Sequence, residues 1–325
     1  MALSTISLLL FALFLAIFHL IIVPLKGALV RLRANYNPKG LQLDPEDGVQ
    51  PHTGPVITSF FVMLSRARRL EGWSGLYKGL MPTLLLSLVL AFFSALFLDA
   101  SLSGQRNHGA YSPPTSGIWS TLIYSIFLML VSLPALIVTY RSITTPYRLP
   151  YLGPFYSLRV LLTPTELRKP WVLYLTPGLL AAEILYICYV VIGLRALRGL
   201  LLPSLSQSDD SQPRDFSPRS FIIYLAISLF STVILCPLEV ISTRLAVQRN
   251  HDSAEFNSVA QEEVGDAEDL PEYSPAEDVI GLRNEKDPYL GLVDCAKRII
   301  DEEGWRALYR GWWLTMLFGV FGAFT

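Results

Sequence analysis

Long apolar runs alternate with shorter polar segments along the whole chain. Each run is long enough to cross a bilayer, because about 20 apolar residues span its hydrocarbon core as a helix. The runs lie near residues 5–30, 80–100, 117–141, 171–197, 219–245 and 306–325. The first run lacks a basic start and a small-residue cleavage site, so we expect a retained transmembrane helix, with a signal anchor as the alternative. The pattern predicts an all-α membrane protein with six transmembrane helices.

The polar segments contain two stretches with helical apolar periodicity, near 56–70 and 289–302. Apolar residues on one face against basic residues on the other predict short amphipathic helices lying at a membrane surface. Residues 252–287 differ, because they are acidic and poor in large apolar side chains. Such a segment buries too little surface to offset the entropy lost on ordering, and we expect it to be disordered.

Two kinds of repetition divide the chain into three parts. Residues 71–79 read EGWSGLYKG and residues 303–311 read EGWRALYRG, each just before an apolar run. Three prolines, Pro24, Pro134 and Pro237, fall late in the first, third and fifth runs, 110 and 103 residues apart. A proline inside a helix removes a backbone hydrogen bond and bends the helix. The spacing predicts three hairpin repeats at 1–104, 115–203 and 216–325, the second degenerate and the third carrying an acidic insertion at 251–288.

Composition agrees with a membrane protein. Hydrophobic residues make up 52% of the chain and charged residues 16%, well below the quarter that is usual in soluble domains. The net charge of −1 argues against a nucleic-acid partner. The three cysteines are far apart, and no metal-ligand spacing, phosphate-binding loop or nucleophile elbow occurs. The sequence therefore predicts neither an enzyme nor a bound cofactor or metal.

These features resemble the mitochondrial carrier family, whose repeats read P-x-[DE]-x-x-[KR]-x-[KR] and later [DE]-G-x-x-x-x-[FYW]-[KR]-G. The second half of that signature is met in full at 71–79 and 303–311, and the first half survives best at Pro237 and Glu239. The resemblance extends over essentially the whole chain. It implies three pseudo-symmetric repeats with short helices on the matrix side, solute transport by alternating access, a monomer, contact with membrane lipid such as cardiolipin, and an inner mitochondrial membrane.

The chain departs from the family at the matrix gate, where carriers place three salt bridges between acid and base positions. Here the acid positions of the three repeats hold Lys26, Leu136 and Glu239. The base positions hold Leu29, Thr139 and Ser242. Lys26 lies three residues before the base position of the first repeat, on the same helical face. The resemblance therefore predicts one displaced gate pair, Glu239 with Lys26.

The family's substrate contacts, carried over position by position, fall on Leu86, on Glu183 with Ile184, and on Phe318. Carriers of anions place bases at these positions, whereas here most are apolar. A carboxylate in the middle of a span is costly and marks a functional site by default, so Glu183 is the strongest candidate. The alternative is that Glu183 pairs with an arginine or tyrosine, or is protonated by desolvation.

Other conspicuous side chains have simpler expected roles. Arg141 and Arg244 follow the second and third prolines by seven residues, and we expect them to extend toward lipid phosphates. Tyr77 and Tyr309 belong to the repeated phrase and are expected to anchor the chain at a membrane interface.

Two functions remain open. The first is a solute carrier of the inner mitochondrial membrane, whose substrate is cationic, zwitterionic or neutral rather than polyanionic. The second is a carrier-like protein without transport activity, working as an adaptor, insertase or fusion factor in the outer membrane. A loss of gate charges is typical of the second, whereas the fold favours the first.

Overall fold

A computed structural model describes residues 2–38, 56–103, 117–150, 153–202, 218–250, 271–273, 277–285 and 287–324. Over these residues the fold consists of helices and one isolated β-bridge. The long helices are α1 (Ala2–Ala34), α3 (Leu80–Ser103), α4 (Ile118–Thr144), the continuous run of α7 (Leu179–Cys188), the π-helix η3 (Tyr189–Leu194) and α8 (Arg195–Leu201), the run of α10 (Pro218–Phe230) and α11 (Thr232–Val247), and α15 (Trp312–Phe324), which lies beside α10. The short elements are α2 (Phe60–Leu76), α5 (Pro154–Leu161), α6 (Pro164–Arg168), η2 (Pro170–Leu175), α14 (Leu292–Glu302) and η4 (Trp305–Tyr309).

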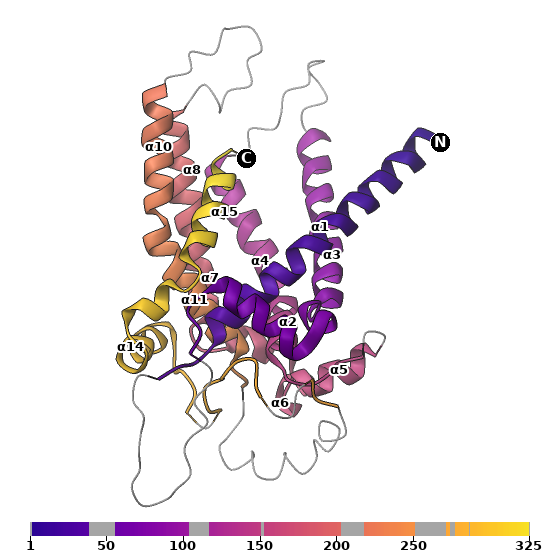
Figure 1. The fold of residues 1–325 in the computed structure, drawn as a ribbon. Coiled ribbons are helices and arrows are strands. Elements are labelled where there is room, and N and C mark those ends of the chain that lie inside the picture. Colours follow the sequence, from indigo (N-terminus) through magenta and orange to yellow (C-terminus); the bar gives the residue numbers. More distant parts are fainter. Residues whose placement is uncertain are drawn as a thin grey trace, which may run out of the picture.

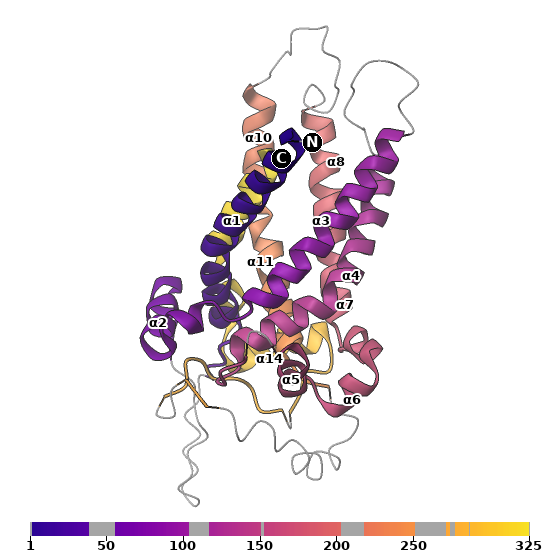
Figure 2. The ribbon, with the colours of Figure 1, turned by 90° about the vertical axis from the view of Figure 1, so that its right-hand side faces the viewer.

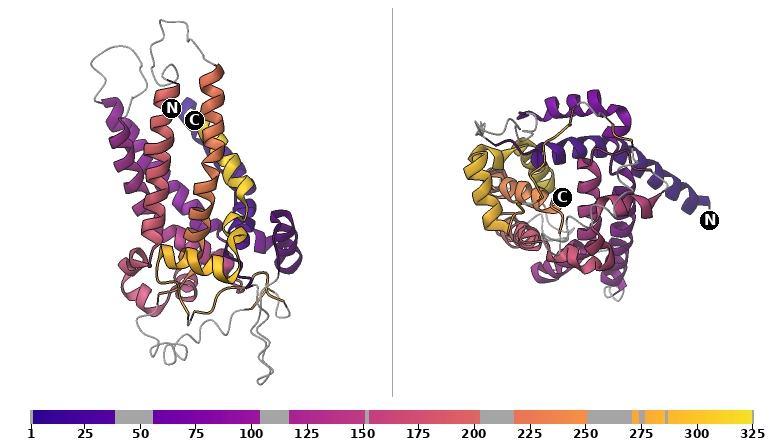
Figure 3. Two further views of the ribbon diagram at one scale, coloured as in Figure 1. Left: turned by 90° about the vertical axis from the view of Figure 1, so that its left-hand side faces the viewer. Right: turned by 90° about the horizontal axis from the view of Figure 1, so that it is seen from below.

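The long helices form an open bundle, and the short helices gather at one end of it (Figure 1). We call this the short-helix end. Seen from the side, α3 runs beside α4 (Figure 2), and α10 contacts α15. The start of α1 leans away from the bundle in the view of Figure 1. The view along the bundle shows α2, α5 and α14 arranged around the periphery (Figure 3).

Among the described residues, four helical segments are long and apolar enough to span a membrane: Leu13–Ala34, Ile118–Thr144, Leu179–Leu201 and Pro218–Val247. A fifth is possible if Phe60–Leu76 and Leu80–Ser94, which meet at 57°, form one bent span. The sequence predicted six. The difference lies in the second run, which counts only as part of that bent pair, and in the sixth, where α15 has 13 residues, fewer than a straight bilayer span requires.

The two predicted amphipathic helices correspond to α2 and α14. The expectation of disorder across 252–287 needs correction for its second half. Residues 271–273 and 277–285 are ordered against the rest of the protein, with Val279 and Ile280 buried in a cluster around α2. A few apolar side chains and backbone hydrogen bonds to neighbouring segments anchor this stretch, which composition alone does not show. The remaining predicted residues, 252–270, 274–276 and 286, lie outside the described residues.

All three prolines lie inside helices, in α1, α4 and α11. A helical proline frees the carbonyl four residues earlier, and in each case a tyrosine hydroxyl donates a hydrogen bond to that carbonyl. The three sets are Pro24, Leu20 and Tyr77; Pro134, Leu130 and Tyr174; and Pro237, Val233 and Tyr309, with hydrogen bonds of 3.2, 2.9 and 3.2 Å. These tyrosines therefore donate to the carbonyls that the prolines leave without a partner in the helix. This role goes beyond the interface anchoring that we expected of Tyr77 and Tyr309.

A second motif also occurs three times, between the end of a proline-containing helix and a nearby glutamate. The buried pairs are Arg31 with Glu71, Arg141 with Glu166, and Arg244 with Glu303. Arg141 and Arg244 thus do not extend toward lipid, which corrects the prediction. Each arginine is close enough to a desolvated carboxylate to form a charge-assisted hydrogen bond, and that contact outweighs hydration of an exposed guanidinium.

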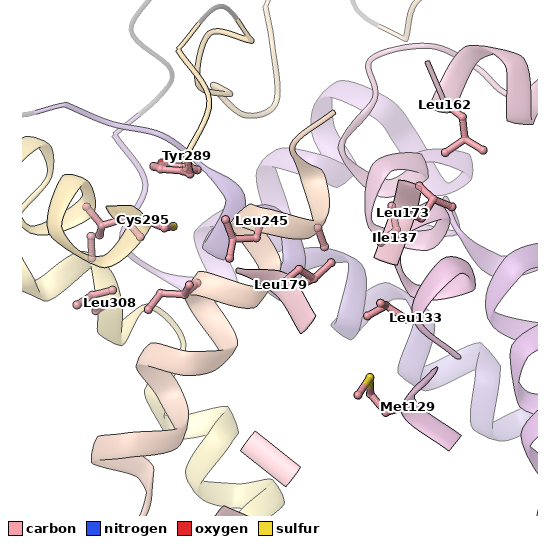
Figure 4. Close-up of a cluster of buried hydrophobic side chains, with 14 residues drawn as sticks. Met129, Leu133, Ile137, Leu162, Leu173, Leu179, Leu245, Tyr289, Cys295 and Leu308 are labelled. Atoms are coloured by element: carbon pink, nitrogen blue, oxygen red, sulfur yellow. The ribbon is translucent and has the colours of Figure 1, made fainter. Parts of the chain in front are cut away.

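The largest apolar cluster joins α4, α7, α11, α14 and η4 at the short-helix end (Figure 4). Leu179, at the start of α7, and Leu245, on α11, are both fully buried there. The turn before α7 requires glycine, because Gly178 has a φ of +81° and a Cβ there would lie 2.2 Å from the backbone nitrogen of Leu292. This close packing holds the short-helix end together. Polar side chains line a separate space between α1, α4, α7 and α11.

Candidate functional site

A polar cavity of about 180 Å³ lies between α1, α4, α7 and α11. Four helices contribute to its wall, so it exists only when the bundle is assembled. Its lining residues are Arg33, Leu136, Tyr140, Ala182, Glu183, Tyr186, Leu238, Glu239 and Ser242. Two carboxylates, one guanidinium and three hydroxyl groups thus converge in the middle of an otherwise apolar bundle, which is the usual character of a binding site for a small polar ligand.

Glu239 is held by a cation and a hydroxyl from two other helices. Arg33 of α1 donates a hydrogen bond to its Oε2 over 2.5 Å, and Thr315 of α15 donates one over 2.6 Å. Arg33 also donates to the Thr315 hydroxyl over 2.8 Å. The three side chains form a closed triangle that joins α1, α11 and α15.

The predicted gate pair, Glu239 with Lys26, therefore has the wrong base. The base bound to Glu239 is Arg33, two helical turns beyond Lys26. Side chains of a helix tilt toward its N-terminus, so the long arginine reaches back along α1 to the level of Glu239. The ammonium of Lys26 lies instead over the ring of Tyr140, 5.6 Å from its centroid.

Glu183 lies in the same cavity and has a different partner. Its Oε1 accepts a hydrogen bond of 2.5 Å from the hydroxyl of Ser242. Lys26 and Glu239 are close enough to act on Glu183 electrostatically. A neutral hydroxyl, rather than a bound cation, thus occupies the position beside this carboxylate.

The other predicted contacts are not part of the cavity wall. Ile184 packs against the large apolar cluster, Leu86 is half-buried on α3, and Phe318 on α15 is 57% exposed. Of the predicted site residues, Glu183 and Glu239 thus lie together in the cavity wall. The three apolar candidates, Leu86, Ile184 and Phe318, do not line it.

Sequence reasoning missed Arg33, Tyr140 and Thr315. Arg33 stands two residues after the last basic position of the first proline motif, so its charge was visible but its partner was not. Tyr140 and Thr315 lie in apolar runs, where a hydroxyl gives no periodic signal. Within the described residues, no group of three histidine, cysteine or acidic side chains is placed to hold a metal ion.

Comparison with known families gives one finding for the C-terminal third of the chain. Residues 215–325 match the family model described as mitochondrial carrier protein. The matched segment contains α10, α11, α14 and α15, and with them Glu239, Ser242 and Thr315 of the cavity region. No curated protein gives a significant match to the chain.

Proposed function

We propose that this chain, whose residues 215–325 match the mitochondrial carrier model, is a member of that family and carries a small solute across the inner mitochondrial membrane. The cavity between α1, α4, α7 and α11 is the proposed binding site, alternately open to the two sides. The short-helix end faces the matrix in this proposal. The solute is cationic or zwitterionic.

One observation supports this choice of substrate more than any other. The Glu183 carboxylate lies in a cavity, and its hydrogen bond comes from the neutral Ser242. A carboxylate within a membrane is costly unless a cation or several donors satisfy it. Arg33 is already bound to Glu239 and the ammonium of Lys26 lies over the ring of Tyr140, so Lys26 acts on Glu183 only at longer range. An ammonium group of a substrate is therefore the natural partner for Glu183. A polyanion would face two carboxylates.

For the architecture we propose three repeats, at 1–104, 115–203 and 216–325, with six membrane crossings. Support comes from the three proline–carbonyl–tyrosine sets and the three buried arginine–glutamate pairs, one of each in every part. In this arrangement α3 and α15 are the crossings that the length criterion leaves open.

The second candidate function, an outer-membrane adaptor or insertase without transport, is favoured by the gate. Leu29 is buried, and Leu136 and Thr139 are uncharged where carriers hold ions. A transporter breaks and remakes such contacts in each cycle, whereas apolar contacts serve a protein that stays closed.

The experiment that separates the two functions is a thermal-shift screen of the purified full chain. The probes are basic amino acids and polyamines on one side and nucleotides and tricarboxylates on the other. A ligand that binds the folded state raises the melting temperature, by an amount that grows with its concentration. We expect shifts from the first group that Glu183→Gln removes and that Asp301→Asn, a matched change on the exposed face of α14, leaves intact. The absence of any shift, with a protein partner crosslinked in the outer membrane, would favour the adaptor.

A further inference from the structure

The two described pieces of the acidic loop, residues 271–273 and 277–285, lie across the short-helix end. We call these residues the strap. They belong to the connection between α11 and α14, and besides the bond from Arg283 to Glu302 on α14 they contact the ends of α1 and α4 and helix α2. The strap thus touches all three parts of the chain.

The strap binds at two places, which we call its seats, and the first is the segment after α4 at residues 146–148. Tyr147 and Glu272 form an antiparallel bridge. The backbone N–H of Arg148 donates to Pro271 over 3.1 Å, and that of Tyr273 donates to Pro146 over 3.2 Å.

The other seat is the end of α1. The backbone N–H of Tyr36 donates to Gly281 over 2.8 Å, and the N–H of Gly281 donates to the side-chain oxygen of Asn35 over 3.0 Å. Beside this seat, Arg66 of α2 donates to the carbonyl of Asp278 over 2.9 Å. Val279 and Ile280, between these contacts, are buried.

The ring of Tyr273 adds a charged contact between the first two parts of the chain. Lys78, from the turn before α3, lies 4.2 Å from its centroid, and the guanidinium of Arg148 lies 4.8 Å away. Two cations from different parts share one aromatic ring, which attracts both through its negative faces.

Basic side chains also join the three parts directly at the short-helix end. At the short-helix end, Arg244 joins the third part to the first through the carbonyls of Arg33 and Asn35, and Arg141 joins the second to the third through Ala246 and Gln248. Between the first and second parts, Lys78 donates to the Thr145 carbonyl over 2.7 Å. The strap adds two hydrogen bonds to the second part and, with both from Arg66, four to the first.

We propose that the strap is a latch that holds the ends of α1 and α4 together while the cavity is closed toward the short-helix end, and that it must leave its seat after α4 before the cavity opens there. The proposal rests on the alternating access proposed above. It assigns to an inserted segment the closure that gate salt bridges provide in the family signature.

The packing beneath the strap is compatible with its release. A cavity of about 220 Å³ separates part of it from the buried Arg31 and Glu71. Lifting the strap at this point uncovers polar side chains that are already paired with each other, and it leaves the large apolar cluster intact.

The first test locks the strap with the double variant Tyr147→Cys and Glu272→Cys, in a full-length chain whose three native cysteines are replaced by serine. Residues of an antiparallel pair of this type have Cα atoms about 4.5 Å apart, within the range that a disulfide bridges. A further change, Leu136→Cys, places a reporter thiol in the cavity wall. The readout is the rate at which a membrane-impermeant maleimide, added after oxidation, labels the reporter from the strap side of orientation-sorted proteoliposomes.

We expect oxidation to form the crosslink and to slow labelling at least tenfold, and reduction of the crosslink to restore the rate. Each single cysteine variant, treated in the same way, should show no oxidation effect. Failure of the crosslink to form, or equal labelling rates before and after reduction, would overturn the latch.

The second test releases the strap with Asn35→Ala and Tyr273→Ala, and separately with the milder Arg66→Ala. Release should raise labelling from the strap side at least tenfold for the double variant and leave labelling from the opposite side unchanged. The control is Leu282→Ala, an exposed side chain of the strap. A rise on both sides of both release variants would indicate unfolding rather than a latch, and unchanged labelling would also overturn the proposal. Since neither test measures transport, the latch can fail while the proposed function stands, and the reverse.

Discussion

At the scale of single residues, Glu166 is the most completely bound carboxylate of the short-helix end. Two hydrogen bonds come from the guanidinium of Arg141, at 2.5 and 2.9 Å, and two from the backbone N–H groups of Thr163 and Asn250. Burial alone would raise the pKa of Glu166, but the hydrogen bonds and charge of Arg141 dominate and lower the pKa below its ordinary 4.5. The ionised form is thus favoured by folding.

This predicts how stability depends on pH. A lowered folded-state pKa gives stabilisation that is complete above the unfolded value and disappears as the pH falls through the folded value. Glu166→Gln leaves Arg141 buried without its partner, at a cost of about 3–5 kcal/mol near neutral pH. The gap in melting temperature between parent and variant should shrink below pH 4.5. Melting curves of both proteins in detergent between pH 3 and 8 measure this difference. A difference that stays constant over that range would contradict the lowered pKa of Glu166.

At the scale of elements, the tyrosine hydroxyls compensate for the prolines inside three helices. A freed carbonyl facing lipid has no water to accept from, so a donor from a neighbouring segment stabilises the helix. Tyr309, the last residue of η4, donates such a hydrogen bond to the Val233 carbonyl of α11. The proline and the tyrosine thus depend on each other although they are distant in sequence.

A double-mutant cycle tests this dependence. Tyr309→Phe should lower the stability by about 1 kcal/mol, the usual net value of such a hydrogen bond. In a Pro237→Ala background the restored backbone N–H can bond to the Val233 carbonyl, so the same change should cost clearly less. Thermal unfolding of the four proteins gives the coupling energy. Purely additive effects would mean that the hydroxyl does not serve the freed carbonyl.

At the scale of the whole molecule, the triangle of Arg33, Glu239 and Thr315 joins the first and the last parts of the chain across the bundle. Arg33 and Glu239 are mostly buried, with 8% and 22% of their side chains exposed. Loss of one partner leaves an uncompensated charge, which is more costly than loss of both.

We therefore expect Arg33→Met and Glu239→Gln each to destabilise the protein by about 3 kcal/mol, and the double variant to lose less than either. The matched control is Lys26→Met with Glu239→Gln, which should be additive within about 0.5 kcal/mol because these two side chains share no hydrogen bond. Chemical unfolding of the purified chain measures both cycles. Coupling in the Lys26 cycle, without coupling in the Arg33 cycle, would restore the pair expected from the signature.

Features that depend on local pattern and on repetition can be recognised from the residues alone. Apolar run length predicted helices at α1, α4, α7–α8 and α10–α11, because a helix in lipid must satisfy its own backbone wherever it lies. Periodicity located α2 and α14, and Glu183 was recognisable because an acid within an apolar run is rare.

Which side chains meet depends on how the helices assemble. Arg33 rather than Lys26 reaches Glu239, since side-chain length and the direction of tilt on α1 set the contact. Arg141 and Arg244 turn inward, since Glu166 and Glu303 arrive from distant segments. The strap is ordered because residues of α1, of α2 and of the segment after α4 bind it. Its own sequence does not reveal these partners. Composition describes how much surface a segment can bury, whereas the folded bundle decides what that surface faces.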